Sequence, residues 1–128
     1  MGLLDFNKIY DYIVRRVELY ELFSSNLDTS RYLLPTENIV CRDVPFCLPI
    51  ISKKNKLKLI KKHLIEESIE YRPIISGNLL RHTCYKEYDN YKDFKNAEIL
   101  HKRGLYVGLH NQVKESQIIK LVDFLNTI

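Results

Sequence analysis

The side chains best suited to bind a ligand gather in one stretch of the sequence, RPIISGNLLRH, and at one later pair of positions. They are Arg72, Asn78, Arg81, His82, His110 and Asn111. A Gly-Asn turn flanked by two arginines suits a phosphate or a carboxylate, because guanidinium groups make bidentate, charge-assisted hydrogen bonds. These six residues form the candidate binding site, and solvated loop side chains are the alternative interpretation.

Other familiar site patterns are missing from the sequence. It has no Gly-rich phosphate loop, no G-x-S-x-G motif and no acidic pair near a histidine at motif spacing. Its histidines lack the i, i+4 spacing of a helical zinc site. The cysteines, Cys41, Cys47 and Cys84, form no close pair, and their odd number predicts reduced thiols in the core. The residues alone therefore indicate no catalytic group, cofactor site or metal site.

Positive charge is concentrated in residues 53–62, KKNKLKLIKK, which contain six lysines and no acid. The formal net charge of the whole chain is +4, so the rest of the chain carries a slight excess of acidic residues. Leu57, Ile60 and Leu64 have the spacing of an amphipathic helix whose lysines face water. The alternative is a small basic module that binds nucleic acid or an acidic partner, for which salt-dependent retention on a polyanion would be evidence. Nucleic acid is the less favoured partner, because no aromatic or arginine side chains are interleaved with the lysines.

The elements that must position the candidate site follow from hydrophobic periodicity. The stripe Phe6, Ile9, Ile13 and Val17 predicts a long first helix within residues 3–25, followed by a polar connection at 26–38. Residues 40–51 favour a strand, and Pro45 and Pro49 on one side of it predict a position at the sheet edge. The basic helix at 54–67 then leads to a second strand at 68–75.

A turn at residues 76–78 and an ordered loop at 79–90 come next. A short helix is expected from 93 to 103, with Asp93 as its N-cap and Gly104 at the C′ position. A third strand at 105–109 and a final helix complete the chain. The final helix carries Ile118, Leu121, Val122 and Leu125.

This order of elements predicts an α+β fold, a small two-layer sandwich with a three-stranded sheet and helices. If the second and third strands were parallel neighbours joined by the helix at 93–103, their carboxyl ends would share one sheet edge. Arg72, Asn78, Arg81 and His110 would then converge on one surface. We treat this convergence as a prediction for the structure.

The 128-residue length and 45% hydrophobic content describe one self-standing domain. No apolar run approaches the roughly 20 residues of a membrane helix, and the first ten residues lack the layout of a secretion signal, so a cytoplasmic location is expected. Only Met1 and Gly2 precede the first helix, which suggests that the chain is part of a longer protein.

Two stretches, IEYRPIISGNLLRHTCY at 69–85 and NAEILHKRGLYVGLHNQV at 96–113, carry a family resemblance. They resemble the C-terminal region of the DegT/DnrJ/StrS family of pyridoxal-phosphate-dependent nucleotide-sugar aminotransferases and dehydratases. The G-N-L-x-R motif is typical of the 3-dehydratase branch. Residues 2–19 are similar to the helix that links the family's large and small domains. The resemblance thus implies a linking helix at 1–25 and a C-terminal small domain at 26–128.

The resemblance also implies a function. The family's small domain closes one side of the sugar-nucleotide cleft, so the six candidate residues would contact a nucleotide-linked keto sugar. The lysine that carries pyridoxal phosphate, or the histidine that replaces it in dehydratases, belongs to the large domain. Lys53 and Lys54 are not that lysine. The chain alone is therefore expected to be inactive and to hold no cofactor, with a separate large domain or a second copy as partner.

Two positions depart from the family pattern. Ser68 stands where the family usually has Gly before its Ile-Glu-x-Arg-Pro segment, and Thr83 stands where a Pro commonly follows the His. Each departure changes the expected local backbone geometry without removing a candidate polar group.

Overall fold

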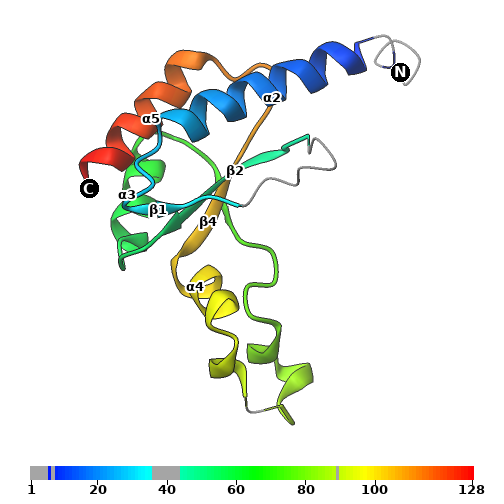
Figure 1. The fold of residues 1–128 in the computed structure, drawn as a ribbon, viewed down its shortest axis with the longest axis vertical. Helices are drawn as coiled ribbons and strands as arrows, with labels where there is room; N and C mark the ends of the chain where they lie inside the picture. Colours follow the sequence, from blue (N-terminus) through cyan, green and yellow to red (C-terminus); the bar gives the residue numbers. More distant parts are fainter. Residues whose placement is uncertain (1–5, 7, 36–43, 89) are drawn as a thin grey trace. The chain divides into compact units, whose positions relative to one another are not determined.

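The structure is a computed structural model that describes residues 6, 8–35, 44–88 and 90–128, and Figure 1 shows how its elements are arranged. The helices in these residues are α2 (Ile9–Asn26), α3 (Leu57–Glu66), α4 (Lys95–Arg103) and α5 (Glu115–Thr127). The strands are β1 (Tyr32–Leu33), β2 (Cys47–Ser52), β3 (Tyr71–Pro73) and β4 (Gly104–Gly108). The short 3-10 helices are η1 (Leu79–Arg81), η2 (Thr83–Tyr85) and η3 (Tyr91–Asp93).

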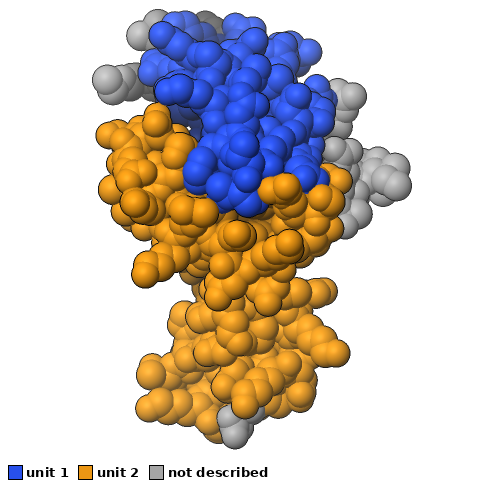
Figure 2. Space-filling view, turned by 90° about the vertical axis from the view of Figure 1, so that its left-hand side faces the viewer, with its two compact units in different colours: residues 1–28, 35–48, 108–128 blue, residues 29–34, 49–107 orange. Residues whose placement is uncertain are grey.

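The chain groups into two compact units, which Figure 2 shows in different colours. Unit 1 comprises residues 1–28, 35–48 and 108–128, and it contains α2 and α5. Unit 2 comprises residues 29–34 and 49–107, and it contains α3, α4 and the 3-10 helices. The division of the sequence into a linking helix at 1–25 and a small domain at 26–128 stays a prediction.

The strands form one sheet in the order β1-β2-β4-β3. Strand β1 pairs antiparallel with β2, with Tyr32 opposite Ser52. The α+β class is confirmed, but the sheet has four strands in the described residues where the sequence predicted three. The sequence analysis missed β1 because two residues inside a polar connection are too few to show alternation.

The prediction that the second and third strands are parallel is wrong. Strands β3 and β4 are antiparallel neighbours, with Arg72 opposite Tyr106 and Pro73 opposite Leu105. The physical reason is the path of residues 74–103: this segment leaves the sheet after Pro73 and returns at Gly104, beside the point where it left. It acts as a long hairpin connection and not as a crossover, so the chain direction reverses. A common sheet edge for His110 with Asn78 and Arg81 therefore does not follow from these strand directions.

The edge position expected for the proline-containing strand is also wrong. Strand β2 lies between β1 and β4 in the sheet order. Pro49 is tolerated there because the described β1 register reaches only Ile51 and Ser52, so no β1 ladder bond falls at Pro49. The predicted strand began at Val40, and residues 40–43 lie outside the described part of the chain.

In unit 1, the first and last helices pack against each other. Helix α2 buries Leu19 and Phe23 completely. Helix α5 buries the four apolar residues predicted from its spacing, Ile118, Leu121, Val122 and Leu125. The side chain of Asn126 ties the end of α2 to α5, because its Nδ2 donates to the Asn26 carbonyl and its Oδ1 accepts from the Asp28 amide, each at 2.8 Å.

The amino-terminal half of α2 has a different character. Ile9 is 51% exposed and Ile13 37%, Tyr10 and Val14 beside them are exposed as well, and Phe6, which precedes the helix, is 69% exposed. Of the apolar stripe predicted on the first helix, Phe6, Ile9 and Ile13 are therefore exposed and Val17 is half-buried. Residues 3–5 and 7 of the predicted helix lie outside the described residues.

Helix α4 ends where predicted but begins differently. It starts at Lys95 after Phe94, and no side chain caps its first turn, so the predicted Asp93 cap is wrong. Gly104 follows the helix in an extended conformation and continues directly into β4. Glycine is needed there for close packing, since a Cβ would lie 2.6 Å from the Leu100 carbonyl oxygen and 2.7 Å from Ile74 Cδ1. The left-handed C′ conformation expected from sequence is absent at this position.

That left-handed conformation occurs instead at the end of α3, on a serine. The amide of Ser68 donates to the Ile65 carbonyl at 3.0 Å, and the amide of Ile69 donates to the Leu64 carbonyl at 2.7 Å. This pair of bonds is the Schellman motif, whose C′ residue is usually glycine. Ser68 occupies C′ with φ at +57°. The departure from the family pattern thus falls at a position where a Cβ costs free energy.

We predict that Ser68→Gly raises the free energy of unfolding by about 1 kcal/mol, because glycine adopts this φ without steric cost. Urea unfolding followed by circular dichroism at neutral pH is the measurement. Ser68→Ala is the matched control: it removes the hydroxyl but keeps the Cβ, so it should bring no gain. An equal gain from alanine would contradict the explanation.

Candidate functional site

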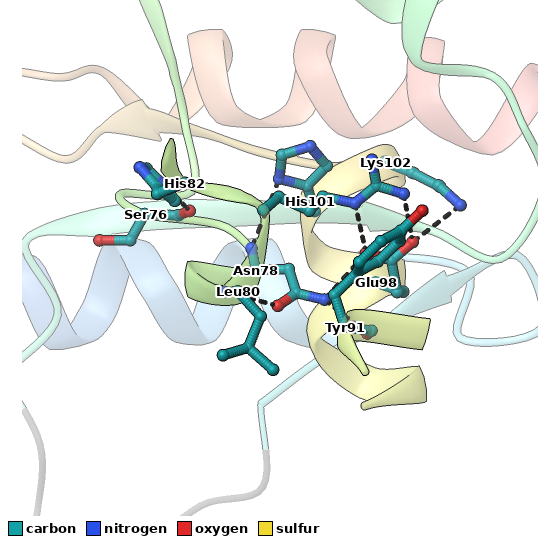
Figure 3. A network of polar contacts seen from close by, with 9 residues as sticks. Ser76, Asn78, Leu80, His82, Tyr91, Glu98, His101 and Lys102 are labelled. Carbon is teal, nitrogen blue, oxygen red and sulfur yellow. Dashed lines mark hydrogen bonds and ion pairs between the residues drawn. The ribbon is translucent and has the colours of Figure 1, made fainter. Parts of the chain in front are cut away.

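A buried carboxylate on α4 organises the segment between β3 and β4 (Figure 3). Glu98 is 9% exposed. Its Oε1 accepts from Arg81 Nε at 2.6 Å and from Asn78 Nδ2 at 2.8 Å. Its Oε2 accepts from Arg81 Nη2 at 2.8 Å and lies 2.8 Å from Lys102 Nζ. One carboxylate therefore joins the turn before η1, the end of η1 and the last turn of α4.

Asn78 is the second buried member of this network, with 2% of its surface exposed. Its Nδ2 donates to Glu98 and also to the Tyr91 carbonyl at 2.9 Å. Its Oδ1 accepts from the Leu80 amide at 3.2 Å and so caps η1. Both side-chain protons and the carbonyl oxygen are thus engaged inside unit 2, as a buried amide requires.

Arg81 makes the bidentate pair that its residue type favours, but with a carboxylate of its own chain. Its guanidinium also stacks on the Tyr91 ring, 4.4 Å from the ring centroid. The hydrogen bonds to Glu98 raise the pKa of Arg81 above its ordinary value. The hydrogen bonds from Arg81, Lys102 and Asn78 hold the pKa of Glu98 far below its usual range, although burial acts in the opposite direction.

The turn that presents Asn78 depends on Gly77. Gly77 has φ at +56°, and its amide closes the turn by donating to the Ile74 carbonyl at 2.7 Å. A Cβ at this position would lie 2.5 Å from His101 Nδ1. The same His101 nitrogen accepts from the Asn78 amide at 3.4 Å. Glycine is thus required here both for its φ and for the close approach of α4.

The other candidate residues have separate surroundings. Arg72 is exposed on β3 and pairs with Glu70. His82 Nε2 lies 2.8 Å from the Ser76 carbonyl oxygen. His110 and Asn111 belong to unit 1, where the amide of Gln112 donates to His110 Nδ1 at 3.2 Å. Of the six candidates, the structure brings only Asn78 and Arg81 together, on Glu98.

Sequence reasoning missed the residues at the centre of this cluster. Glu98 and Lys102 have the i, i+4 spacing of a helical ion pair, which could have drawn attention to them. No local pattern pointed to Tyr91 or His101, because their partners lie on other elements of the segment.

Residues 1–126 match the model of the DegT/DnrJ/EryC1/StrS aminotransferase family. The chain belongs to this family. A curated relative, GDP-4-keto-6-deoxy-D-mannose 3-dehydratase from Escherichia coli O55:H7 (strain CB9615 / EPEC), is 34% identical over 90 residues, which is 65% of this chain and 22% of the relative.

Solved structures of the same enzyme class are similar to this DegT/DnrJ/EryC1/StrS chain over nearly its whole length. The E. coli GDP-4-keto-6-deoxy-D-mannose-3-dehydratase with bound hydrated PLP matches 97% of the chain with a TM-score of 0.78 and 28% identity. A mutant of GDP-4-keto-6-deoxymannose-3-dehydratase with bound GDP-perosamine matches 97% with a TM-score of 0.76 and 29% identity. The chain spans 33% of each of these structures.

The DegT/DnrJ/EryC1/StrS family gives reason to ask whether residues of this chain could hold pyridoxal phosphate. A lysine that reacts with the cofactor's aldehyde needs a desolvated amine. No described lysine is buried. Two lysines of α3 make surface contacts: Lys61 lies over the Tyr71 ring, and Lys62 pairs with Glu66 at 3.7 Å. The lysines of the described residues therefore do not fit the cofactor.

The described residues contain no group of three His, Cys, Asp or Glu side chains placed to hold a metal ion. None of their helices combines the length and hydrophobicity needed to cross a membrane. Of the thiols in this part of the chain, Cys47 and Cys84 are free, and burial raises the pKa of Cys47. Cys84 is exposed, so it does not lie in the core where the sequence placed it.

The low pKa of Glu98 makes a testable contribution to stability. Because the folded state binds this proton more weakly than the unfolded state, the contribution is complete above the ordinary glutamate pKa of about 4.3 and is lost as the pH falls below it. We expect the free energy of unfolding to drop less between pH 7 and pH 3 in Glu98→Gln than in the wild type, as measured by urea unfolding. Glu66→Gln, which changes a surface pair, should keep the wild-type drop. Equal drops in all three proteins would contradict this assignment.

Proposed function

We propose that this chain is the C-terminal small domain of a PLP-dependent nucleotide-sugar dehydratase or aminotransferase, and that it closes one side of the sugar-nucleotide cleft. The observation that carries the proposal is the match of 97% of the chain to one third of 3-dehydratase structures. A segment that matches a third of an enzyme, without buried lysine in its described residues, is suited to binding and positioning. It is not suited to the complete reaction.

The substrate class follows from the relatives. The curated relative is named for a GDP-linked keto sugar, and one solved relative binds GDP-perosamine. We therefore propose a nucleotide-linked keto sugar as the ligand of the assembled protein. Arg72, Arg81 and His82 of unit 2 would supply charge and hydrogen bonds that orient it. His110 and Asn111 of unit 1 are separate candidates for a ligand contact, each to be tested by its own substitution. For Asn78 we propose an indirect role, since its side chain is fully engaged in fixing the turn that carries Arg81.

Pyridoxal phosphate would be held by the remainder of the protein. When bound there, it would supply the electron sink that the chemistry of the sugar ring requires. The residues of this chain would exclude water from the cleft and orient the sugar nucleotide, and they would make no covalent bond to the cofactor.

We predict that the purified 128-residue chain, incubated with pyridoxal phosphate and reduced with borohydride, carries no specific lysine adduct. The reason is that none of its described lysines is buried, so none has the desolvated surroundings in which an amine reacts specifically with the cofactor's aldehyde. Mass spectrometry of tryptic peptides is the measurement, and an exposed-lysine control protein sets the background. A stoichiometric adduct at one lysine would refute the prediction.

The exposed stripe on α2 is the proposed contact of this chain with the rest of the protein. Ile9 and Ile13 lie one turn apart on α2, Phe6 precedes this helix, and all three side chains are exposed in the isolated chain. Contiguous exposed apolar surface usually marks a contact. We propose that a large domain, supplied as a separate chain or in the same protein, covers this face, and that the isolated chain otherwise associates with itself through it.

We predict that the chain restores conversion of GDP-4-keto-6-deoxy-D-mannose by a relative that lacks the matched third. Ile9→Asp should abolish the restoration because it places a charge in the stripe. Ile65→Asp changes an even more exposed isoleucine on α3 and should have little effect. Arg72→Ala should keep the pairing and weaken sugar-nucleotide binding by about tenfold, the equivalent of one charge-assisted hydrogen bond.

Sedimentation of the isolated chain keeps this test decisive if the truncated relative fails to fold. The wild type should sediment above the monomer mass at high concentration, and Ile9→Asp should sediment as a monomer. A monomeric wild type at high concentration, or loss of association in Ile65→Asp as well, would count against the proposed contact.

A further inference from the structure

The Glu98 network contains more positive than negative charge. Arg81 and Lys102 contact the one carboxylate directly. Lys92 lies over the same Tyr91 ring that Arg81 stacks on, 5.7 Å from its centroid. Asp93 and Lys95 follow along the chain and carry opposite charges. The cluster thus retains a net positive charge after its central ion pair is formed, which favours an anionic ligand.

The two cations that contact Glu98 are held close together. Arg81 Nη2 and Lys102 Nζ each lie 2.8 Å from the same oxygen, Oε2, so they cannot be farther apart than the sum of those two distances. Like charges this near each other repel, and the carboxylate between them makes the arrangement stable. The pair is therefore assembled in advance of any ligand.

Both cations keep donors available to solvent. The bonds to Glu98 use Arg81 Nε and Nη2, and among the described residues nothing accepts a hydrogen bond from Nη1. The Lys102 ammonium has three protons and makes one contact in the same part of the chain. The side chain of Arg81 is 30% exposed and that of Lys102 is 58% exposed. A ligand can thus reach donors of both groups.

We propose that Arg81 and Lys102 form a binding site for a phosphate group, and that Glu98 is the positioning residue that fixes their geometry. The proposal rests on the proposed function, because the diphosphate of a nucleotide-linked sugar is the phosphate that would occupy the site. Guanidinium and ammonium groups are the usual phosphate ligands, and a fixed guanidinium loses less entropy on binding than a free one. Arg81 touches the ligand in this proposal, whereas Glu98 acts through Arg81 and Lys102.

The role assigned to Glu98 leads to an unusual expectation. A nearby carboxylate opposes anion binding by simple Coulomb repulsion, so its neutralisation should tighten binding if charge alone mattered. If Glu98 positions the two cations, neutralisation releases them and weakens binding. The sign of the effect of Glu98→Gln therefore separates a positioning role from a purely electrostatic one.

The test is a titration of the ¹⁵N-labelled 128-residue chain with inorganic pyrophosphate at low ionic strength and pH 7. Calorimetry gives the affinity, and NMR spectra of the arginine Nε–H and lysine Nζ groups locate the ligand. We expect the Arg81 and Lys102 signals to shift and Glu98→Gln to weaken binding at least fivefold.

Glu66→Gln is the matched control, because it removes the same charge from a surface pair on α3, and it should not weaken binding. Arg81→Lys keeps the charge but loses the guanidinium fork, so it should weaken binding even if Glu98→Gln folds poorly.

Three results would overturn the proposal. They are the absence of shifts at Arg81 and Lys102 at millimolar pyrophosphate, shifts confined to the α3 lysines, and binding by folded Glu98→Gln that is as tight as wild type or tighter. Because this titration needs only the isolated chain, its failure is distinct from a failure of complementation. A chain that binds pyrophosphate as proposed but does not restore a truncated relative would contradict the proposed function alone.

Discussion

The segment between β3 and β4 depends on one buried carboxylate. An ionised group that leaves water is costly unless charges and hydrogen bonds replace the lost hydration. Glu98 meets this condition with Arg81, Lys102 and Asn78, and each of these partners comes from a different position along the segment. Burial of Glu98 therefore requires the turn at Gly77, the helix η1 and the last turn of α4 to adopt their observed arrangement together.

The G-N-L-x-R motif of the family supplies three of the groups on which the burial of Glu98 depends. In the G-N-L-x-R stretch, Gly77 supplies the left-handed turn, Asn78 supplies the cap of η1, and Arg81 supplies the bidentate partner of Glu98. The described contacts thus give the motif a structural role. Any contact of Arg81 with a sugar nucleotide would use the part of the guanidinium that Glu98 leaves free, which ties substrate binding to the integrity of the network.

Much of the fold could be predicted from local pattern. The final helix and the basic helix follow from apolar spacing. The observed α5 buries all four residues expected from it, whereas α3 buries Ile60 and Leu64 and leaves Leu57 half-buried. Strand direction could not be predicted, because a helix between two strands occurs both in crossovers and in long hairpin connections. The error for β3 and β4 carried over to the site, since the convergence of His110 with Arg72, Asn78 and Arg81 was derived from parallel strands.

The sequence by itself determined the family, the α+β class and the chemical character of the candidate residues, because motif spacing and residue type are local properties. It also marked Ser68 as an exception to the family pattern, at a position that proves to have a positive φ. Only the tertiary structure decided that Asn78 is buried and that Arg81 is paired with Glu98. These two facts depend on the return of the chain from α4 into β4, which pairs with β3, and no local pattern encodes such a long-range pairing.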